Sequence, residues 1–373
     1  MTGNAGNEGV NAVGAEREAT TSAGAGVSLT RYDPECPVSV IVVNCNGRDH
    51  LEVCLSSLLR QTLQPVEVIV VDNGSNDGSV AFVRERFGAA IRLIANPTNP
   101  GYGAALNTGI RAARGRYLIA LNNDTELDTG CVQALVEAAD TYPNAGSCAP
   151  KILSFHDRNV IDNVGHLLYI DGLSRGRGRL EVDRGQYDRP EEVIGASGCA
   201  VLLRRAMLAD VGLFDEDFFA YCEDTDLALR ARLAGWTCRY VPAAVVYHKY
   251  SAFWGEYSPR KAFFVERNRV WTAVKCLPAW LLVLSPLFTL LRFAAQGWGA
   301  LRRRGAAGRF ATAHSRGALA LVLVRAAAAA AAGLPRMWQR RRSIQRHRRV
   351  PAMAAAAWLR DFGMGVREVA LKD

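Results

Sequence analysis

Residues 38–75 read VSVIVVNCNGRDHLEVCLSSLLRQTLQPVEVIVVDNGS, and this stretch indicates the class of fold. Two runs of β-branched residues, Val38–Val43 and Val66–Val71, flank a segment whose apolar residues recur at helical spacing. Continuous β-branched runs are typical of strands that are buried on both faces of a parallel sheet. A strand, a helix and a second strand at this spacing therefore predict a parallel pair joined by a crossover helix.

The same alternation continues up to about Asp140 and then loosens. Further elements are expected as a helix from Ser79, strands at Ile91–Ala95 and Tyr117–Leu121, a helix at Ala104–Arg114, and later strands at His166–Ile170, Val193–Leu203 and Val241–Tyr247. The sequence predicts an α/β fold with a mostly parallel central sheet and an irregular, partly antiparallel second half.

Polar residues follow three of the expected strands at the point where each strand ends. They are Asn44, Asn46, Asp72, Asn73, Asn122, Asn123 and Asp124. Ligands of parallel sheets bind outside the carboxyl ends of the strands, so these side chains are expected to line one crevice. The competing interpretation is that each residue only caps the helix that follows it, which is common for Asn and Asp.

The densest cluster of acids lies in Phe218–Trp236, FFAYCEDTDLALRARLAGW. Glu223, Asp224 and Asp226 occupy the first turn of an expected helix, where the helix dipole favours negative charge. A helix start explains one or two acids but does not require three beside an aromatic run. The pattern alone leaves a helix start and an active site equally open.

Two smaller features are ambiguous by themselves. Gly101 and Gly103 open a helix after a strand, but Leu106 stands where a dinucleotide fingerprint has its third glycine, which disfavours a Rossmann oxidoreductase. These glycines instead favour close approach of the backbone to a ligand or strand. A lone histidine such as His248 is most often structural, although its place after a strand makes it a candidate metal ligand.

The charge of the chain is unevenly distributed. The net charge is +9, yet residues 292–350 hold fourteen Arg and no Lys, Asp or Glu, which leaves −5 for the remainder. Two apolar segments, 278–300 and 317–334, are interrupted by Arg292 and Arg325, so neither is predicted to span a membrane. Apolar helices flanked by arginines indicate a tail that lies on an anionic membrane surface. Nucleic acid is the disfavoured alternative, because no stacking aromatics alternate with these arginines.

The cysteines and the N-terminal residues of the sequence indicate the cellular compartment of the protein. Nine cysteines occur without a C-x-x-C pair, which argues for a reducing compartment and against a disulfide framework or a zinc site. Residues 1–35 are rich in Gly, Ala, Asn, Ser and Thr and lack an apolar core, so a disordered leader is expected instead of a secretory signal. The main domain is expected in the cytoplasm, on the inner face of the plasma membrane.

Six ordered motifs between about Pro37 and Trp271 together resemble glycosyltransferase family two, especially its bacterial rhamnosyltransferase-like branch. They are VSVIVVNCNG, VIVVDNGSNDGS, NPGYGAALNTGI, LIALNNDTEL, GCAVLLRRAMLADVGLFDEDFFAYCEDTDLALRARLAGW and the RNR that follows His248. The resemblance implies a GT-A fold, a nucleotide-diphosphate-sugar donor, inverting chemistry and Mg²⁺ or Mn²⁺ as cofactor. It does not identify the sugar.

The resemblance also implies roles for single residues. Asp224 matches the catalytic base, with Glu223 beside it to position the acceptor. Asp124 matches the metal-binding end of the D-x-D motif, and His248 is an additional candidate ligand. The residues that are expected to bind the nucleotide-sugar donor are Asn44, Asn46, Asp72, Asn73, Gly101, Asn107, Asn122, Asn123 and Arg267. Because the motif begins with Asn122 and not Asp, one carboxylate is left to hold the metal, which Mg²⁺ tolerates.

The expected organisation is a leader over 1–35, a transferase domain over 36–275 and a basic helical tail over 276–373. Within the domain, residues 36–125 form the nucleotide-sugar half and 126–275 the acceptor half. The expected function is transfer of L-rhamnose from dTDP-L-rhamnose to a hydroxyl of a lipid-linked or cell-surface glycan, such as a polyprenyl-diphosphate-linked one. The processive motif Q-x-x-R-W is absent, which favours addition of one or a few sugars.

Three alternatives remain open at this point. The donor could be a UDP- or GDP-sugar. The protein could be a glycoside hydrolase that uses Asp124 and Asp224 as its carboxylate pair. It could also be a non-catalytic membrane or nucleic-acid binding protein whose partner is recognised by the arginine tail.

Overall fold

The structure is a computed structural model that describes residues 29–64, 66–250, 258–302, 308–309 and 316–371. Residues 1–28 of the expected leader lie outside the described residues. The proposed boundary between domain and tail falls at the end of helix α7 (Pro259–Cys276), two residues before helix α8 (Ala279–Leu301) begins.

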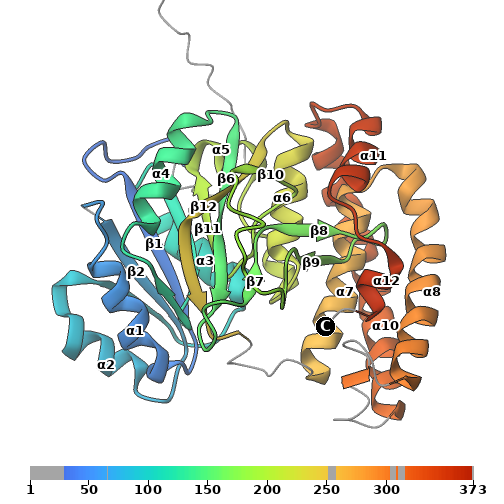
Figure 1. The fold of residues 1–373 in the computed structure, drawn as a ribbon, viewed down its shortest axis with the longest axis horizontal. Coiled ribbons are helices and arrows are strands. Elements are labelled where there is room, and N and C mark those ends of the chain that lie inside the picture. The colour runs from blue at the N-terminus through green and yellow to red at the C-terminus, as the bar shows by residue number, and fades with distance from the viewer. Residues whose placement is uncertain (1–28, 65, 251–257, 303–307, 310–315, 372–373) are drawn as a thin grey trace, which may run out of the picture.

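A ten-stranded mixed sheet forms the centre of the described part of the molecule (Figure 1). Eight strands lie in the order β10-β12-β6-β11-β4-β1-β2-β3, while β5 pairs with β12 and β7 with β6. Their bounds are β1 Val38–Asn44, β2 Val66–Asn73, β3 Arg92–Asn96, β4 Tyr117–Asn122, β5 Thr125–Leu127, β6 Ala145–Ser154, β7 Ile161–Asn163, β10 Glu191–Val193, β11 Ala200–Arg204 and β12 Thr237–His248. The β1–β4 half is parallel and the later half mixes both directions, as predicted.

Helices cover both faces of this sheet, because alternate side chains of each strand point to opposite faces. One core contains Val40 and Val42 of β1, and the other contains Ile41 and Val43. The helices are α1 Arg48–Leu59, α2 Ser79–Phe87, α3 Tyr102–Ala112, α4 Cys131–Thr141, α5 Arg205–Val211 and α6 Glu223–Leu233, with short 3₁₀ turns at Gly88–Ala90 and Glu216–Phe218. Helices α1, α2 and α4 contribute to the first core, and α3, α5 and α6 to the second.

The predicted strand Val193–Leu203 is wrong in one respect, because it consists of two strands. β10 ends at Val193 and β11 starts at Ala200, and residues 194–199 between them are not in a strand. This connection contains Gly195 and Gly198, which lack the side chains that favour strand pairing. The break matters because Ser197, Gly198 and Cys199 line the main cavity of the molecule.

The C-terminal helices pack beside the sheet domain as a bundle (Figure 1). Besides α7 and α8 they are α10 Arg316–Arg346, α11 Ala352–Asp361 and α12 Val366–Leu371. Segments Ala279–Gly299 and Gly317–Arg346 are long and apolar enough to cross a membrane by length and composition. The Arg292 side chain, however, is fully buried and bonds to Asp171, between β8 and β9, and to Glu266 of α7, so α8 is fastened to these two elements.

A small hairpin connects this bundle to the sheet domain. Strands β8 (His166–Leu168) and β9 (Ser174–Gly176) pair with each other and form a separate two-stranded sheet. The backbone of Leu168 bonds to Phe362 and Met364, which lie between α11 and α12. The hairpin therefore depends on residues that follow it by nearly 200 positions.

Candidate active site

A cavity of about 740 Å³ lies at the carboxyl ends of β1, β2 and β4, where α6 begins and β12 ends. Nine of the residues predicted for the site line it. They are Asn46, Asn73, Gly101, Asn122, Asn123, Asp124, Glu223, Asp224 and His248. The chain thus brings the candidate base, the candidate metal ligands and part of the predicted donor set to one place.

Asn44 and Asp72 lie beneath this surface and are both fully buried. Strand register places them side by side, and the Asn44 amide donates to Asp72 Oδ2 at 2.7 Å. The Asn123 amide in turn donates to Asn44 Oδ1 at 2.6 Å. The buried pair therefore supports Asn123, which does line the cavity.

Two predicted donor-binding residues are engaged elsewhere. Asn107 is buried, and its side chain bonds to both the N–H and the C=O of Phe214. Arg267 donates to the carbonyls of Asp217 and Phe218 and lies over the ring of Trp271. Neither lines the cavity, and both hold the chain segment that precedes α6.

Asp124 and His248 line the cavity, and their side chains face each other. Asp124 Oδ1 and His248 Nε2 lie 3.4 Å apart, and both are buried without a hydrogen-bond partner among the described residues. Burial would raise the pKa of Asp124, but the facing imidazole outweighs burial and lowers it. Burial would lower the pKa of His248, but neighbouring groups that include Asp124 and Asp162 raise it well above its usual value.

This pair fits a divalent cation. A carboxylate oxygen suits Mn²⁺ and Mg²⁺, and an imidazole nitrogen that has lost its proton is a ligand for divalent transition metals such as Mn²⁺. His248 Nδ1 faces Asp162 Oδ2 at 2.7 Å, the arrangement in which a second carboxylate orients a ligating imidazole. Within the described ranges no group of three or more His, Cys, Asp or Glu side chains could hold a metal, so the remaining ligands would come from substrate and water.

Glu223 and Asp224 line the same cavity from the start of α6. The Asp224 side chain is about one-fifth exposed, whereas Glu223 is 5% exposed and its Oε2 has no hydrogen-bond partner. Burial and the charge of Asp224 raise the pKa of Glu223 to about 8. At neutral pH Glu223 is therefore uncharged and adds no second anion beside Asp224.

The backbone before α6 is strained. Phe219, Tyr221 and Cys222 have φ of 63°, 68° and 65°, a left-handed conformation that costs non-glycine residues free energy. The buried amide of Asn268 on α7 donates to three carbonyls of this loop. Gly101 packs against it so closely that a Cβ there would lie 2.5 Å from the Phe219 oxygen.

Asp226 belongs to neither part of the site. It is fully buried and bonds to Arg230 at 2.8 Å and Lys275 at 2.6 Å. The third acid of the cluster is thus a partner in an internal ion network and not only a first-turn residue.

Sequence reasoning missed Tyr102, Asp162, His166 and Asn268. Tyr102, Asp162 and His166 line the cavity, and Asn268 holds its strained wall. The RNR motif contains Asn268 and was a usable signal. Asp162 and His166 lie in the irregular half of the chain, where no periodic pattern marked them.

Comparison with known proteins gives consistent matches. Residues 39–212 match the sequence model of a family described as Glycosyl transferase family 2. An N-acetylglucosaminyl-diphospho-decaprenol L-rhamnosyltransferase of Mycobacterium tuberculosis is 33% identical over 232 residues, which cover 56% of this chain and 75% of that protein. The Bacillus subtilis protein EpsJ, an uncharacterized glycosyltransferase, is 40% identical over 105 residues, 28% of this chain and 30% of that protein.

A solved structure shares the architecture. The crystal structure of GalNAc-T7 with UDP, GalNAc and Mn²⁺ aligns with a TM-score of 0.54 and 17% identity, over 65% of this chain and 48% of that chain. At this identity the likeness concerns the fold alone. The predicted α/β architecture with C-terminal helices is confirmed.

Proposed function

Because this chain belongs to glycosyltransferase family 2 and is a nucleotide-sugar transferase with a GT-A-like fold, we propose that it transfers L-rhamnose, with inversion, from dTDP-L-rhamnose. The proposed acceptor is a hydroxyl of a polyprenyl-diphosphate-linked glycan. The similarity to the N-acetylglucosaminyl-diphospho-decaprenol L-rhamnosyltransferase of Mycobacterium tuberculosis supports the choice of sugar and of acceptor class. The observation that carries the transferase chemistry is the placement of Asp124 and Asp224 in one cavity.

Asp224 is the proposed general base. As the acceptor oxygen bonds to the anomeric carbon and the bond to the diphosphate breaks, Asp224 takes the hydroxyl proton. Its Oδ2 accepts from Gly198 N at 2.9 Å and its Oδ1 from Thr225 N at 2.6 Å, so the carboxylate has a fixed orientation. Uncharged Glu223 adds no second anion beside the reacting hydroxyl.

Asp124 and His248 are the proposed holders of Mg²⁺ or Mn²⁺. Such an ion, when bound, stabilises the charge that develops on the leaving diphosphate. Asn46, Asn73 and Asn122 are left to bind the donor on the neighbouring strand ends.

The donor assignment is tested by thermal shift with dTDP, UDP and GDP and by release of nucleotide from their sugars. We expect dTDP to stabilise most and dTDP-L-rhamnose to be turned over. Stabilisation by UDP or GDP but not by dTDP would change the nucleotide of the proposed donor, whereas the proposed class of reaction, sugar transfer, would stand. Asp224→Asn is expected to lower turnover about 100-fold or more without weakening dTDP binding.

We further propose that the protein acts in the cytoplasm, bound peripherally to the inner face of the plasma membrane through α8 and α10. Both helices expose large apolar side chains at helical spacing. These are Trp280, Val283, Leu287, Leu290 and Trp298 on α8, with Leu321, Val324 and Trp338 on α10. An exposed apolar face next to arginines is typical of helices that lie in a lipid interface.

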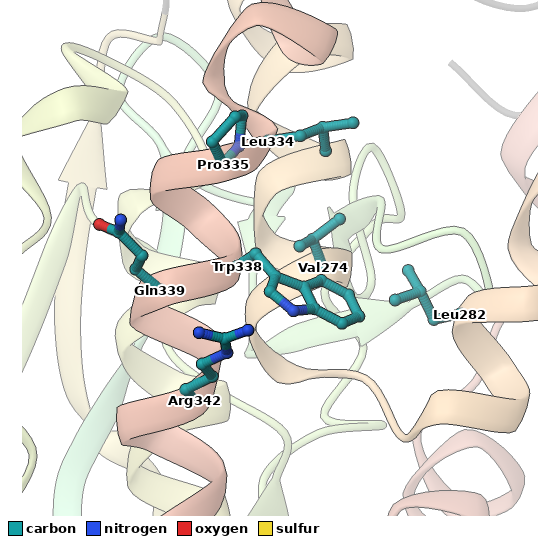
Figure 2. A pocket seen from close by; sticks show the side chains of 7 residues that line it. All are labelled: Val274, Leu282, Leu334, Pro335, Trp338, Gln339 and Arg342. Atoms are coloured by element: carbon teal, nitrogen blue, oxygen red, sulfur yellow. The ribbon is translucent and has the colours of Figure 1, made fainter.

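A groove of about 510 Å³ lies within this surface, between α7, α8 and α10. Figure 2 shows Trp338 of α10 beside Val274 of α7 and facing Leu282 of α8, with Arg342 one turn further along α10. An apolar groove with a guanidinium nearby is chemically suited to an acyl chain and its phosphate. The groove therefore supports an orientation in which the surface formed by α8 and α10 contacts the bilayer.

The membrane proposal is tested by flotation with vesicles of phosphatidylcholine with and without phosphatidylglycerol. We expect binding to the anionic vesicles that weakens with salt, and loss of binding in Val283→Asp and Leu287→Asp. Leu180→Asp is the control, because Leu180 is equally exposed but lies on the sheet domain. Unchanged binding by both α8 variants would rule out this face.

A further inference from the structure

His166, the first residue of β8, lies against the proposed base. Its side chain is 8% exposed and lines the same cavity. Its Nε2 is 3.7 Å from Asp224 Oδ2, and its Nδ1 is buried without a hydrogen-bond partner among the described residues. A buried imidazole so close to a reactive carboxylate, with an unused nitrogen, has no purely structural explanation in its contacts.

The rest of the hairpin also converges on Asp224. Ser174, the first residue of β9, lies 2.5 Å from Thr225 Oγ1, and that hydroxyl donates to Asp224 Oδ1 at 3.1 Å. Ser174 of the hairpin thus contacts Thr225 of α6, which donates to one oxygen of the Asp224 carboxylate, and His166 of the hairpin lies near the other oxygen. The backbone N–H of His166 bonds to Gly195, which anchors the histidine at this position.

The proton that Asp224 accepts must leave before the next turnover. Glu223 is unsuited to receive it, because burial and the adjacent Asp224 raise its pKa to about 8 and it is already protonated at neutral pH. A neutral imidazole has a lone pair on one nitrogen and can accept a proton there. Moving His166 Nε2 about 1 Å closer to Asp224 Oδ2 would bring the pair to hydrogen-bond distance.

We propose that His166 takes over the acceptor proton from Asp224 through Nε2 and, once protonated there, donates to the Asp224 carboxylate. The inference rests on the proposed function, since it assumes Asp224 is the base. The proton passes from the acceptor hydroxyl to Asp224, from Asp224 to His166, and from His166 to water in the cavity. Each transfer breaks one bond to hydrogen and forms another: the hydroxyl O–H is replaced by an O–H on Asp224, then by an N–H on His166, and finally by an O–H on water, so no oxidant or further reactant is needed.

The test compares His166→Gln with His166→Ala. Glutamine can place a hydrogen-bonding atom near the former Nε2 but cannot carry the proton, whereas alanine leaves a space that free imidazole can enter. Release of nucleotide is followed with water as acceptor, using the dTDP-, UDP- or GDP-sugar that the wild-type protein turns over. His156→Gln is the matched control, because His156 is exposed in a loop outside the cavity.

We expect kcat to fall about 10- to 100-fold in both His166 variants, with donor KM and dTDP-induced thermal stabilisation unchanged. Added imidazole should restore activity to His166→Ala but not to His166→Gln. A wild-type kcat in His166→Gln, or no response of His166→Ala to imidazole, would overturn the proposal. Turnover by the wild-type protein reports separately on the proposed function.

Discussion

The side-chain amide of Asn268 holds the most strained part of the site. It reaches the carbonyls of Phe218, Ala220 and Tyr221 at 2.8–2.9 Å, all in the loop that places Glu223 and Asp224. Left-handed residues such as Tyr221 and Cys222 cost about 1–3 kcal/mol each and persist where surrounding contacts enforce them. One amide on α7 thus fixes the direction in which the proposed base enters the cavity.

Asn268→Ala should therefore lower both stability and turnover. The buried carbonyls lose their donor, and we expect the free energy of unfolding to fall by about 2–4 kcal/mol. Denaturant titration measures this change, and nucleotide release measures kcat. Asn159→Ala is the control, because Asn159 is exposed. A variant as stable as the control would show that the loop holds its conformation without the amide.

Glu223 should make stability depend on pH. Its usual pKa is 4.5, and in the fold it is raised to about 8, so between these values the unfolded chain has lost a proton that the folded chain keeps. The free energy of unfolding should then fall as pH rises through this window, by up to about 1.4 kcal/mol per pH unit from this group. The stabilisation that Glu223 contributes is fully present below pH 4.5 and is lost above about pH 8.

Glu223→Gln should remove this decline. We expect its advantage in unfolding free energy over the wild type to grow between about pH 5 and pH 8, as followed by denaturant titration in matched buffers. A difference that stays constant across these buffers would mean that Glu223 is ionised in the fold at neutral pH.

At the scale of elements, α8 is docked by a buried ion cluster. Arg292 donates to Asp171 at 2.8 Å and to Glu266 at 2.7 Å, and Arg269 also bonds to Glu266. Breaking a buried ion pair by removing one partner leaves an uncompensated charge, which costs about 3–5 kcal/mol. The residue that interrupts the apolar segment is therefore the one that attaches it to the domain.

Arg292→Met should release α8 from the sheet domain. We expect faster amide hydrogen exchange across α8 and a lower unfolding temperature, because Asp171 and Glu266 lose their shared cation. Arg302→Met is the control, since Arg302 is exposed just beyond the helix. Exchange in α8 that matches the control would show that apolar packing alone holds the helix.

The parallel half of the sheet could be predicted from the sequence because its signals are local. Val38–Val43 and Val66–Val71 are β-branched runs, and Asn122–Asp124 ends a strand that is buried on both faces. The second half could be predicted only in part. Strands were expected where β8, β11 and β12 lie, but β9 has three residues and no periodic pattern, and its pairing depends on turns and distant contacts. No periodic pattern in the sequence marked His166 as a site residue, and the left-handed positions Phe219, Tyr221 and Cys222 hold no glycine that would have marked them.

The contacts of the arginines in the tail are a second feature that could not be predicted from the sequence. Their abundance predicted a membrane surface, yet Arg336 and Arg340 pair with Asp217, and Arg349 pairs with Asp210. Part of the basic charge therefore docks α10 on the acidic domain. Which arginines face inward depends on tertiary packing that the composition of a helix does not record.

At the scale of the whole molecule, the C-terminal segment completes the site. The carbonyl of Phe362 accepts from Leu168 N, and Met364 N donates back to Leu168 O. Arg175 of β9 bonds to the carbonyl of Glu368, and Val369 itself lines the cavity. Distant parts of the chain thus hold the hairpin that carries His166.

Removing residues 362–373 should therefore lower kcat while leaving the nucleotide side of the cavity intact. We expect dTDP to stabilise the shortened protein as before, measured by thermal shift, with nucleotide release reduced at least tenfold. Met364→Pro is the milder variant, because it removes one N–H donor to Leu168 and keeps the helices. Full turnover by both would mean that the hairpin needs no C-terminal support.

The contact between Arg175 and Glu368 joins residues 193 positions apart. At ribosomal speeds of about 5–20 residues per second, the second partner is synthesised roughly 10–40 s after the first. During that interval the growing chain already contains the strand ends that line the cavity, but not the partners of the β8–β9 hairpin. The hairpin therefore gains its partner at Glu368 only after the rest of the cavity wall has been synthesised.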